Sequence, residues 1–174
     1  MASILRFDNW QNSDGTSIAT TDSSGNISFA GAGAGKILQV AQATNTTQQA
    51  FNTSTYTAVT NLNVSMTPQS SQSKFLLIMT LYLTHLNTDK QSFATFYRGD
   101  PASSGIDVCG NRLLRTTETG GGSGDFHMSG SFLDSPSTTS ETTYYVAFKT
   151  TGTVTNYINY SSSVSSLIVV EVGQ

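Results

Sequence analysis

Apolar residues from about position 36 onward recur at every second position in short runs. In "NLNVSMTP" the residues Leu62, Val64 and Met66 share one face, and the run stops at Pro68. Alternation of period two is typical of a β-strand with one buried and one wet face. Such runs lie near 36–42, 59–67, 74–86, 92–98, 106–115, 125–133, 142–150, 155–160 and 166–172. No window shows the 3.6-residue period of a helix, so we predict an all-β chain that forms an antiparallel sandwich or barrel.

Two of these runs, "KFLLIMTLYL" and "SLIVVEV", are apolar on both faces. A strand in a simple sandwich has only one face to bury, so the second face must be covered by the N-terminal segment, by a long loop or by another copy of the chain. The scarcity of charge in these runs favours a subunit interface. We therefore expect a homo-oligomer, with four interface residues in these runs: Leu77, Met79, Leu81 and Val169.

Residues 1–35 form a polar, turn-rich segment with only isolated apolar positions. A segment of this kind cannot build a core of its own. Yet Phe7, Trp10 and Phe29 are each worth about 1.5–3 kcal/mol when buried. We predict an extended N-terminal arm at 1–35 that docks these three aromatic side chains on another surface, followed by a sandwich domain at 36–174.

The stretch "GAGAGKILQV", residues 31–40, stands between the two parts and superficially resembles a phosphate-binding loop. A P-loop requires a first Gly separated by four residues from the Gly-Lys pair, and a Ser or Thr directly after the Lys. Ala30 and Ile37 occupy these two positions. We interpret the stretch as a flexible joint between the arm and the sandwich.

No motif predicts catalytic residues, metal ligands or a cofactor site, and we expect a protein that is not an enzyme. Cys109 with His85 or His127 would supply a thiol and a base, but no local signature accompanies them. A buried thiol and two surface or rim histidines are the plainer interpretation. Two histidines and one cysteine without close spacing also do not form a zinc motif.

The charge argues against nucleic acid as a partner, and the length of the apolar runs argues against a membrane span. The net charge is −3, only 11% of residues are charged, and the cations are scattered, whereas phosphate binding needs grouped cations. The longest apolar run, "FLLIM" at 75–79, is too short for a spanning helix. The apolar patch in "MASILRFDNW" is too short for a signal peptide, so we expect synthesis in a cytoplasm.

Several segments together resemble a known family. "MASILRFDNWQ", followed by Gly15, resembles the N-terminal attachment segment of many tail-fibre and virion proteins of tailed bacteriophages, especially phages of cyanobacteria and other aquatic bacteria. "GKILQVAQ", "NLNVSMTPQSSQSKFLLIM", "FYRGD", "FLDSPSTTSETTYYVAFKT", "NYINYSS" and "SSLIVVEV" are similar to successive blocks of the knob domain in those proteins, with Asn61 where a Gly is common. The resemblance implies a jelly-roll β-sandwich that assembles as a trimer, and it carries no shared catalytic residues.

This resemblance implies a structural protein at the virion surface: a trimeric capsid decoration or cement protein, or a short head or tail fibre. Its docking partner would be the major capsid protein or another virion structural protein. The arm contains no heptads or repeats that could build a shaft, which favours a stubby trimer. The alternative is the receptor-binding tip of a tail fibre, which recognises a host surface glycan through the 99–107 and 115–125 loops with Tyr97, Arg98 and Arg112.

Overall fold

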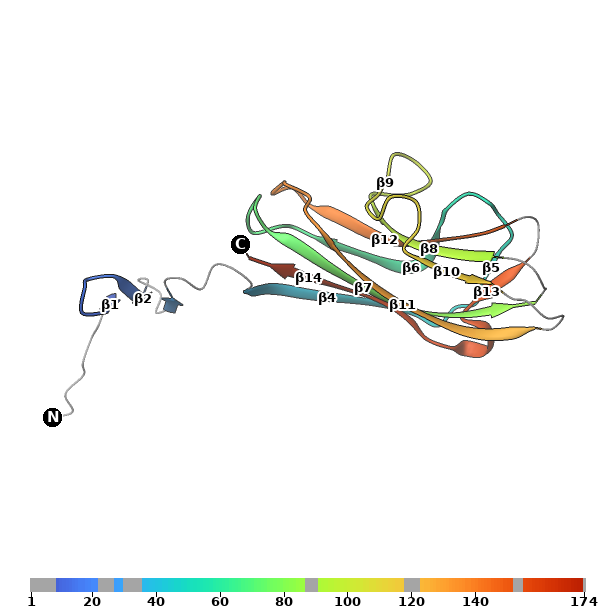
Figure 1. Cartoon of the computed structure of the whole chain (residues 1–174), viewed down its shortest axis with the longest axis horizontal. Helices are drawn as coiled ribbons and strands as arrows, with labels where there is room; N and C mark the ends of the chain where they lie inside the picture. Colours follow the sequence, from blue (N-terminus) through green and yellow to red (C-terminus); the bar gives the residue numbers. More distant parts are fainter. Residues whose placement is uncertain are drawn as a thin grey trace.

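The computed structural model describes residues 9–21, 27–29, 36–86, 91–117, 123–151 and 155–173. Within these ranges the chain consists of antiparallel β-strands, and its helical element is a single 3₁₀ turn, η1 (Tyr160–Ser162). The strands from Ile37 onward form two sheets that face each other, and three short strands near the N-terminus form a separate small sheet (Figure 1). The predicted all-β class and the antiparallel sandwich are confirmed.

The first sheet of the sandwich contains six strands arranged around β7 (Lys74–His85). β11 (Gly124–Asp134) pairs with β7 along one edge. β14 (Ser165–Val172) and β13 (Asn156–Ile158) pair with β7 along the other edge, one after the other. β4 (Ile37–Asn45) then pairs with β14, and β5 (Gln49–Phe51) pairs with β13.

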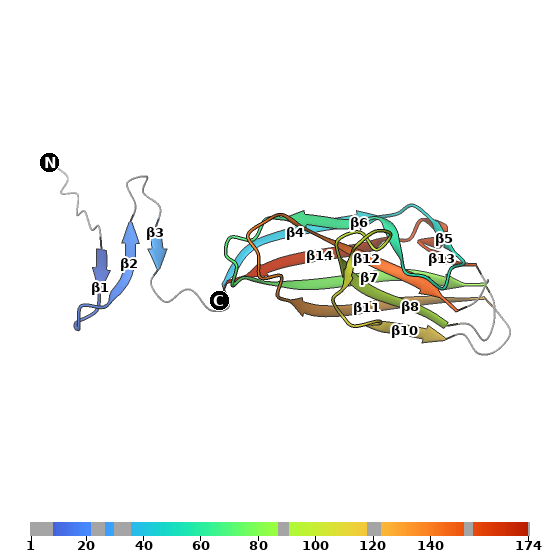
Figure 2. The same ribbon diagram turned by 90° about the horizontal axis from the view of Figure 1, so that it is seen from above.

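The second sheet has the order β10 (Leu114–Thr117), β8 (Gln91–Arg98), β12 (Thr142–Thr150) and β6 (Thr57–Met66), with β9 (Ile106–Asp107) paired to β8. Strands that follow one another in the sequence repeatedly cross from one sheet to the other (Figure 2). The longer strands therefore stand in the orders β4–β14–β7–β11 and β6–β12–β8–β10.

The hydrophobic core lies between the two sheets. Phe75 of β7 packs on Tyr144 of β12 with 5.5 Å between the ring centroids, and Phe51 of β5 meets Phe148 of β12 edge to face at 4.9 Å. These side chains are buried because successive residues of a strand point to opposite faces of its sheet. Each such burial stabilises the sandwich by about 1.5–3 kcal/mol.

Most of the predicted runs coincide with strands, and the clearest exception is the run at 106–115. It divides into β9 and β10, because residues 108–113 form a loop between them. β5 was not predicted, since its three residues are too few to show alternation. Asn61 interrupts β6 with a φ of 58°, a left-handed conformation that Gly and Asn tolerate best.

The arm was predicted to be extended, but part of it folds back on itself. β1 (Asn9–Gln11), β2 (Ser17–Thr21) and β3 (Ile27–Phe29) form a small antiparallel sheet. The turn between β1 and β2 is closed locally: the backbone N–H of Thr16 donates to the side chains of Asn12 and Asp14, and Gly15 has a φ of 82°. This small sheet has little apolar core, so these hydrogen bonds are what stabilises the turn between β1 and β2.

Asn159 joins three strands of the first sheet. It is fully buried with a left-handed φ of 58°. Its Nδ2 donates to the carbonyl oxygens of Asn45 at 2.9 Å and Thr47 at 3.3 Å, and its Oδ1 accepts from the Ser165 hydroxyl at 2.6 Å. Its backbone N–H donates to the carbonyl oxygen of Tyr82 at 3.0 Å. This one side chain therefore ties the end of β4 to the beginning of β14, beside β7.

We predict that Asn159→Ala lowers the free energy of unfolding by at least about 2 kcal/mol, because Ala disfavours the left-handed conformation and leaves buried carbonyls without donors. Urea unfolding followed by circular dichroism measures the change. Asn63, exposed on β6, gives the control Asn63→Ala, which should change stability by less than about 0.5 kcal/mol. Equal small losses in both variants would contradict the role assigned to Asn159.

Candidate binding site

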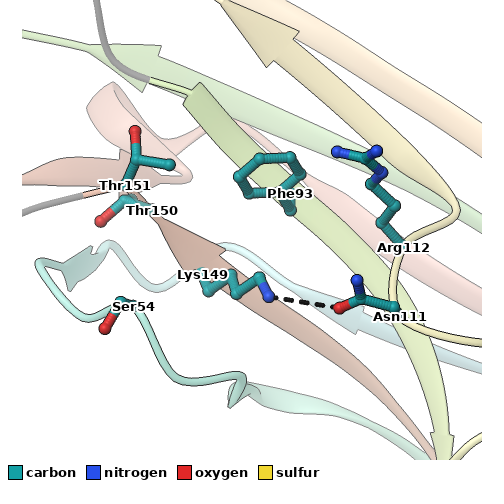
Figure 3. Close-up of a pocket in the computed structure, with 7 residues that line it drawn as sticks. All are labelled: Ser54, Phe93, Asn111, Arg112, Lys149, Thr150 and Thr151. Carbon is teal, nitrogen blue, oxygen red and sulfur yellow. Dashed lines mark hydrogen bonds between the residues drawn. The ribbon is translucent and has the colours of Figure 1, made fainter.

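A pocket of about 310 Å³ opens on the outer side of the second sheet, between the 52–56 loop and the 108–113 loop. Figure 3 shows the ring of Phe93 with Arg112 on one side and Thr151 on the other, and Lys149 reaching toward Asn111. We call this hollow the Phe93 pocket. Its lining residues are Ser54, Phe93, Asn111, Arg112, Lys149, Thr150 and Thr151.

The carboxylate of Asp107 fixes the loop on one side of the Phe93 pocket. Its Oδ1 accepts from the Thr95 hydroxyl at 2.7 Å and from the backbone N–H of Cys109 at 3.0 Å, and its Oδ2 accepts from the backbone N–H of Asn111 at 2.9 Å. The Tyr56 hydroxyl donates to the Asn111 carbonyl oxygen. Burial, followed by the nearby charge of Asp107, raises the pKa of Tyr56, so the phenol stays protonated and remains a donor.

Two cations flank the Phe93 ring. The guanidinium carbon of Arg112 lies 5.7 Å from the ring centroid and the Lys149 ammonium 5.6 Å from it. The ammonium is also 4.1 Å from the centroid of Tyr56 and 3.5 Å from Oδ1 of Asn111. Among the described residues neither cation forms an ion pair, and no carboxylate lines the pocket. The Phe93 pocket is therefore a positively charged site with aromatic walls.

The structure separates the three predicted glycan contacts. Arg112 lines the Phe93 pocket, and Tyr97 lies beside it with its ring 5.9 Å from that of Tyr56. Arg98 lies in a different hollow, of about 510 Å³, which Asp100 and Glu141 also line. Phe93 and Lys149 were not predicted as site residues. The sequence signal for Lys149 was that it lies on the outward face of an alternating run.

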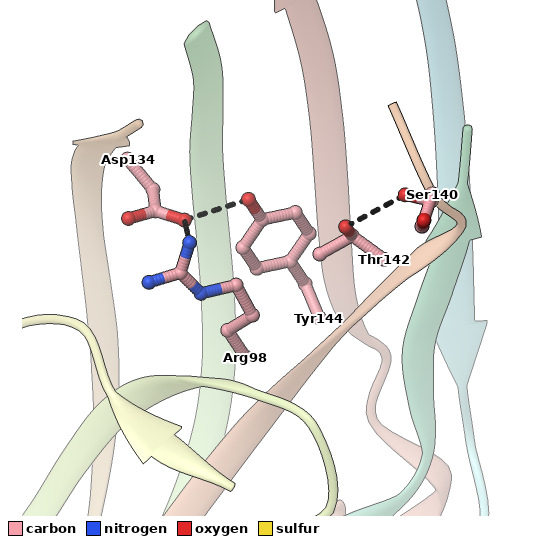
Figure 4. A network of polar contacts seen from close by, with 5 residues as sticks. All are labelled: Arg98, Asp134, Ser140, Thr142 and Tyr144. Carbon is pink, nitrogen blue, oxygen red and sulfur yellow. Dashed lines mark hydrogen bonds and ion pairs between the residues drawn. The ribbon is translucent and has the colours of Figure 1, made fainter. Parts of the chain in front are cut away.

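The charge of Arg98 is already compensated. Its Nη1 lies 3.6 Å from Oδ2 of Asp134, and the same oxygen accepts from the hydroxyl of buried Tyr144 at 2.7 Å (Figure 4). Burial, together with the hydrogen bond to Asp134, raises the pKa of Tyr144 and keeps the hydroxyl protonated. The network joins β8, β11 and β12, and it gives Arg98 a structural role.

The predicted subunit-interface residues lie elsewhere than expected. Leu77, Met79, Leu81 and Val169 are fully buried within the single chain and belong to the core between the sheets. They cannot contact a second copy, because the β8–β12 sheet already covers the face of β7 and β14 that carries them. The prediction of these four residues was therefore wrong: they lie on the inward face of β7 and β14, and only the outward face of these strands is open to a second copy.

The other face of these strands is apolar and points outward. Val40, Val170, Leu76 and Leu133 stand directly opposite one another across β4, β14, β7 and β11, and Ile168 lies opposite Ile78 in a neighbouring row. Val40 is 59% exposed and Leu133 is 49% exposed. We call these six residues the apolar outer face. Lys74 is the sole charged residue among the outward-facing positions of β7 and β14.

The three predicted docking aromatics fall on the arm. Trp10 lies in β1 and is 61% exposed, so its indole is available for contact. Phe29 lies in β3, of which the backbone alone is described. Phe7 lies outside the described residues.

The thiol and the two histidines do not form a catalytic pair. Cys109 is half-buried, and the neighbours that act on its thiol are Phe96, Thr95, Asp107 and Asp134. His85 is buried with its ring 5.0 Å from that of Phe126, whereas His127 is exposed on β11.

Over the described ranges, no three His, Cys, Asp or Glu side chains gather into a group able to hold a metal ion. In the same ranges no helix is long and apolar enough to cross a membrane.

Comparisons with known proteins give only distant structural likenesses. No family model and no curated protein matches the chain. The chain is similar to a structure of the Gx strain of infectious bursal disease virus, at 13% identity and a TM-score of 0.48, over 78% of this chain and 32% of that one. It is also similar to a crystal structure of the particle of this virus, at 10% identity and a TM-score of 0.45, over 84% and 39% of the two chains. The chain thus spans less than two fifths of these viral chains, and a likeness this distant carries no inference about function.

We predict that Cys109 reacts slowly with iodoacetamide in the folded protein. Burial raises its pKa above the ordinary 9.0, so the reactive thiolate is scarcer than in a free peptide. By linkage, the stability from the neutral thiol is complete below the unfolded pKa and is lost as pH rises through the folded pKa. Stability of the native chain should therefore fall relative to Cys109→Ala above pH 9.0. Native alkylation as fast as that of the urea-unfolded chain at every pH would contradict this burial effect.

Proposed function

We propose that the chain is a structural protein of a tailed bacteriophage virion, either a trimeric decoration or cement protein of the capsid or a short head or tail fibre. The observation that carries the structural role is the apolar outer face, which a solitary chain leaves in water. The ordered sequence blocks from "MASILRFDNWQ" to "SSLIVVEV" support the tailed-phage assignment. The crossing of successive strands between the sheets supports interpreting the sandwich as a jelly roll.

In this proposal the apolar outer face is where copies of the chain meet around a threefold axis. Six apolar side chains in adjacent rows form a contiguous patch, which on monomeric proteins usually marks an interaction site. The face is almost free of charge, so identical copies do not repel each other when they pack through it. The proposed interface therefore uses outward-facing residues of the same strands, such as Leu76 and Val170, in place of the predicted Leu77 and Val169.

The arm attaches the trimer to the particle, with the major capsid protein or another virion structural protein as partner. Trp10 supports this role because its large indole is exposed to water on a small sheet, and burial of this ring against a partner protein would be favourable. Three arms in one trimer would raise the overall affinity through effective concentration. The copy number on purified particles distinguishes a capsid location from a tail location. The number of copies of a capsid protein should be proportional to the number of shell subunits, whereas that of a tail fibre should be proportional to the number of tails.

A second function has its own support. The Phe93 pocket is a hollow with aromatic, cationic and hydroxyl groups, which fits a receptor-binding tip that recognises a host surface glycan. Purified protein should then compete with phage for host cells. Lack of competition at high concentration would remove this alternative and leave the structural role intact.

We predict that Val40→Asp converts the trimer to a monomer, because a carboxylate in the contact would be buried without a partner. The change is tolerable in the single chain, since Val40 is 59% exposed. Sedimentation velocity at micromolar concentration measures the assembly state. The matched control is Val164→Asp in the loop before β14, where Val164 is 57% exposed outside the apolar outer face. A monomeric native chain, or a trimer unaffected by Val40→Asp, would refute this interface.

We predict that Trp10→Ala leaves the trimer folded and prevents its incorporation into particles. The measurement is complementation of a phage that lacks the protein, followed by quantification of the variant on purified particles. Ile18→Ala, an exposed apolar change in the same small sheet, is the control and should incorporate normally. Trp10 is the single tryptophan of the chain, so its fluorescence should also shift to shorter wavelength on docking. Normal incorporation of Trp10→Ala would remove the docking role.

A further inference from the structure

The Phe93 pocket concentrates positive charge in a protein that is acidic overall. The chain has a net charge of −3, yet the two charged residues that line this pocket are both cations, Arg112 and Lys149. Arg98, in contrast, is paired with Asp134. Two cations that face one hollow without a carboxylate repel each other, and an anion bound between them would relieve this repulsion. The first requirement on a ligand is therefore a negative charge.

The rest of the lining selects against a bare inorganic anion. The exposed part of the Phe93 ring, 6% of the residue, contributes to one wall, and the hydroxyls of Ser54 and Thr151 and the amide of Asn111 also line the pocket. An aromatic ring bordered by hydroxyl and amide groups suits a ligand that has both an apolar ring face and several hydroxyls. The volume of about 310 Å³ lies at the lower end of the range of ligand sites, which limits the occupant to a small unit.

The pocket is also built from rigid parts. Phe93 lies in β8 and Lys149 in β12, which pair directly opposite each other. The loop that carries Arg112 is fixed by the three hydrogen bonds to Asp107 and by the Tyr56 hydroxyl. Because these groups are already held in place, a ligand would not have to order them on binding.

We propose that the Phe93 pocket binds an acidic saccharide, a sugar unit that carries a carboxylate. The carboxylate lies between Arg112 and Lys149, the ring rests against Phe93, and the hydroxyls contact Asn111, Ser54 and Thr151. An acidic peptide such as a run of glutamates would satisfy the cations and could hydrogen-bond the hydroxyls through its amides, but it has no ring face to place against Phe93, so the saccharide is favoured. This inference deepens the second function proposed above and names the ligand class of that site.

The test is isothermal titration of the purified full chain with trisaccharides of galacturonate, glucuronate and mannuronate. We expect at least one of the three to bind, with affinity that falls as salt is raised, and the neutral trisaccharide maltotriose to bind much more weakly. Lys149→Gln and Arg112→Gln should each weaken binding about tenfold or more, the loss of one charge-assisted contact. Lys149→Arg should retain most of the affinity.

Lys36→Gln is the matched control, because it removes one positive charge from an exposed residue just before β4 in the other sheet, away from the pocket. Its affinity should equal that of the native chain. Absence of binding to all three acidic trisaccharides, equal binding of triglutamate or sulfate, or equal losses in Lys36→Gln would each overturn the proposal. Since this assay needs no cells, binding here together with failed competition for host cells would refute the host-recognition function alone.

Discussion

The alternation of side chains along β7 is the constraint on which the rest of the structure depends. Phe75, Leu77, Met79 and Leu81 point inward, and Leu76 and Ile78 point outward. The inward set meets the β8–β12 sheet and forms the core, while β11, β13 and β14 all use β7 as their hydrogen-bonding partner. A shift of one residue in register would exchange the two sets and expose Phe75, Leu77, Met79 and Leu81. The position of β7 therefore decides which apolar residues stabilise the chain and which remain for contacts.

The two sheets have outer surfaces of opposite character. The outer side of the first sheet is mainly aliphatic along β4, β14 and β7, and it also carries Lys74 on β7 and the exposed Asp125 and His127 on β11. The outer side of the second sheet carries the aromatic rings of Tyr56 and Phe93, both buried under two loops, beside Lys149. Packed sheets lie about 10 Å apart, so one surface can be covered without closing the other. Assembly through the first sheet is thus compatible with ligand binding on the second.

Period-two alternation was enough to predict the strands of the sandwich, because one buried face imposes that pattern on every long strand. It was not enough to decide which face of a doubly apolar strand is inside, since Leu76 and Leu77 look alike in sequence. The effect of one polar side chain was also hidden in the sequence. The carboxylate of Asp107 accepts from the backbone N–H groups of Cys109 and Asn111, and so it holds the loop that carries Asn111 and Arg112 into the Phe93 pocket. Lys149 and Phe93 are 56 positions apart in the sequence, and only their pairing across β8 and β12 makes them neighbours.

The position of β4 would link the proposed attachment of the arm to the proposed assembly of the sandwich. Ile37 begins β4 directly opposite Val172, and the backbone N–H of Gly173 donates to the carbonyl oxygen of Lys36 at 2.8 Å. This end of the first sheet also carries Val40 and Val170, so the arm starts beside the apolar outer face. In a trimer packed through that face, the three arms would leave from neighbouring points near the axis rather than from the periphery. If the arms dock on the particle as proposed, docking of one arm would place the other two close to equivalent sites, and individually weak contacts, such as one made by Trp10, would be sufficient in combination.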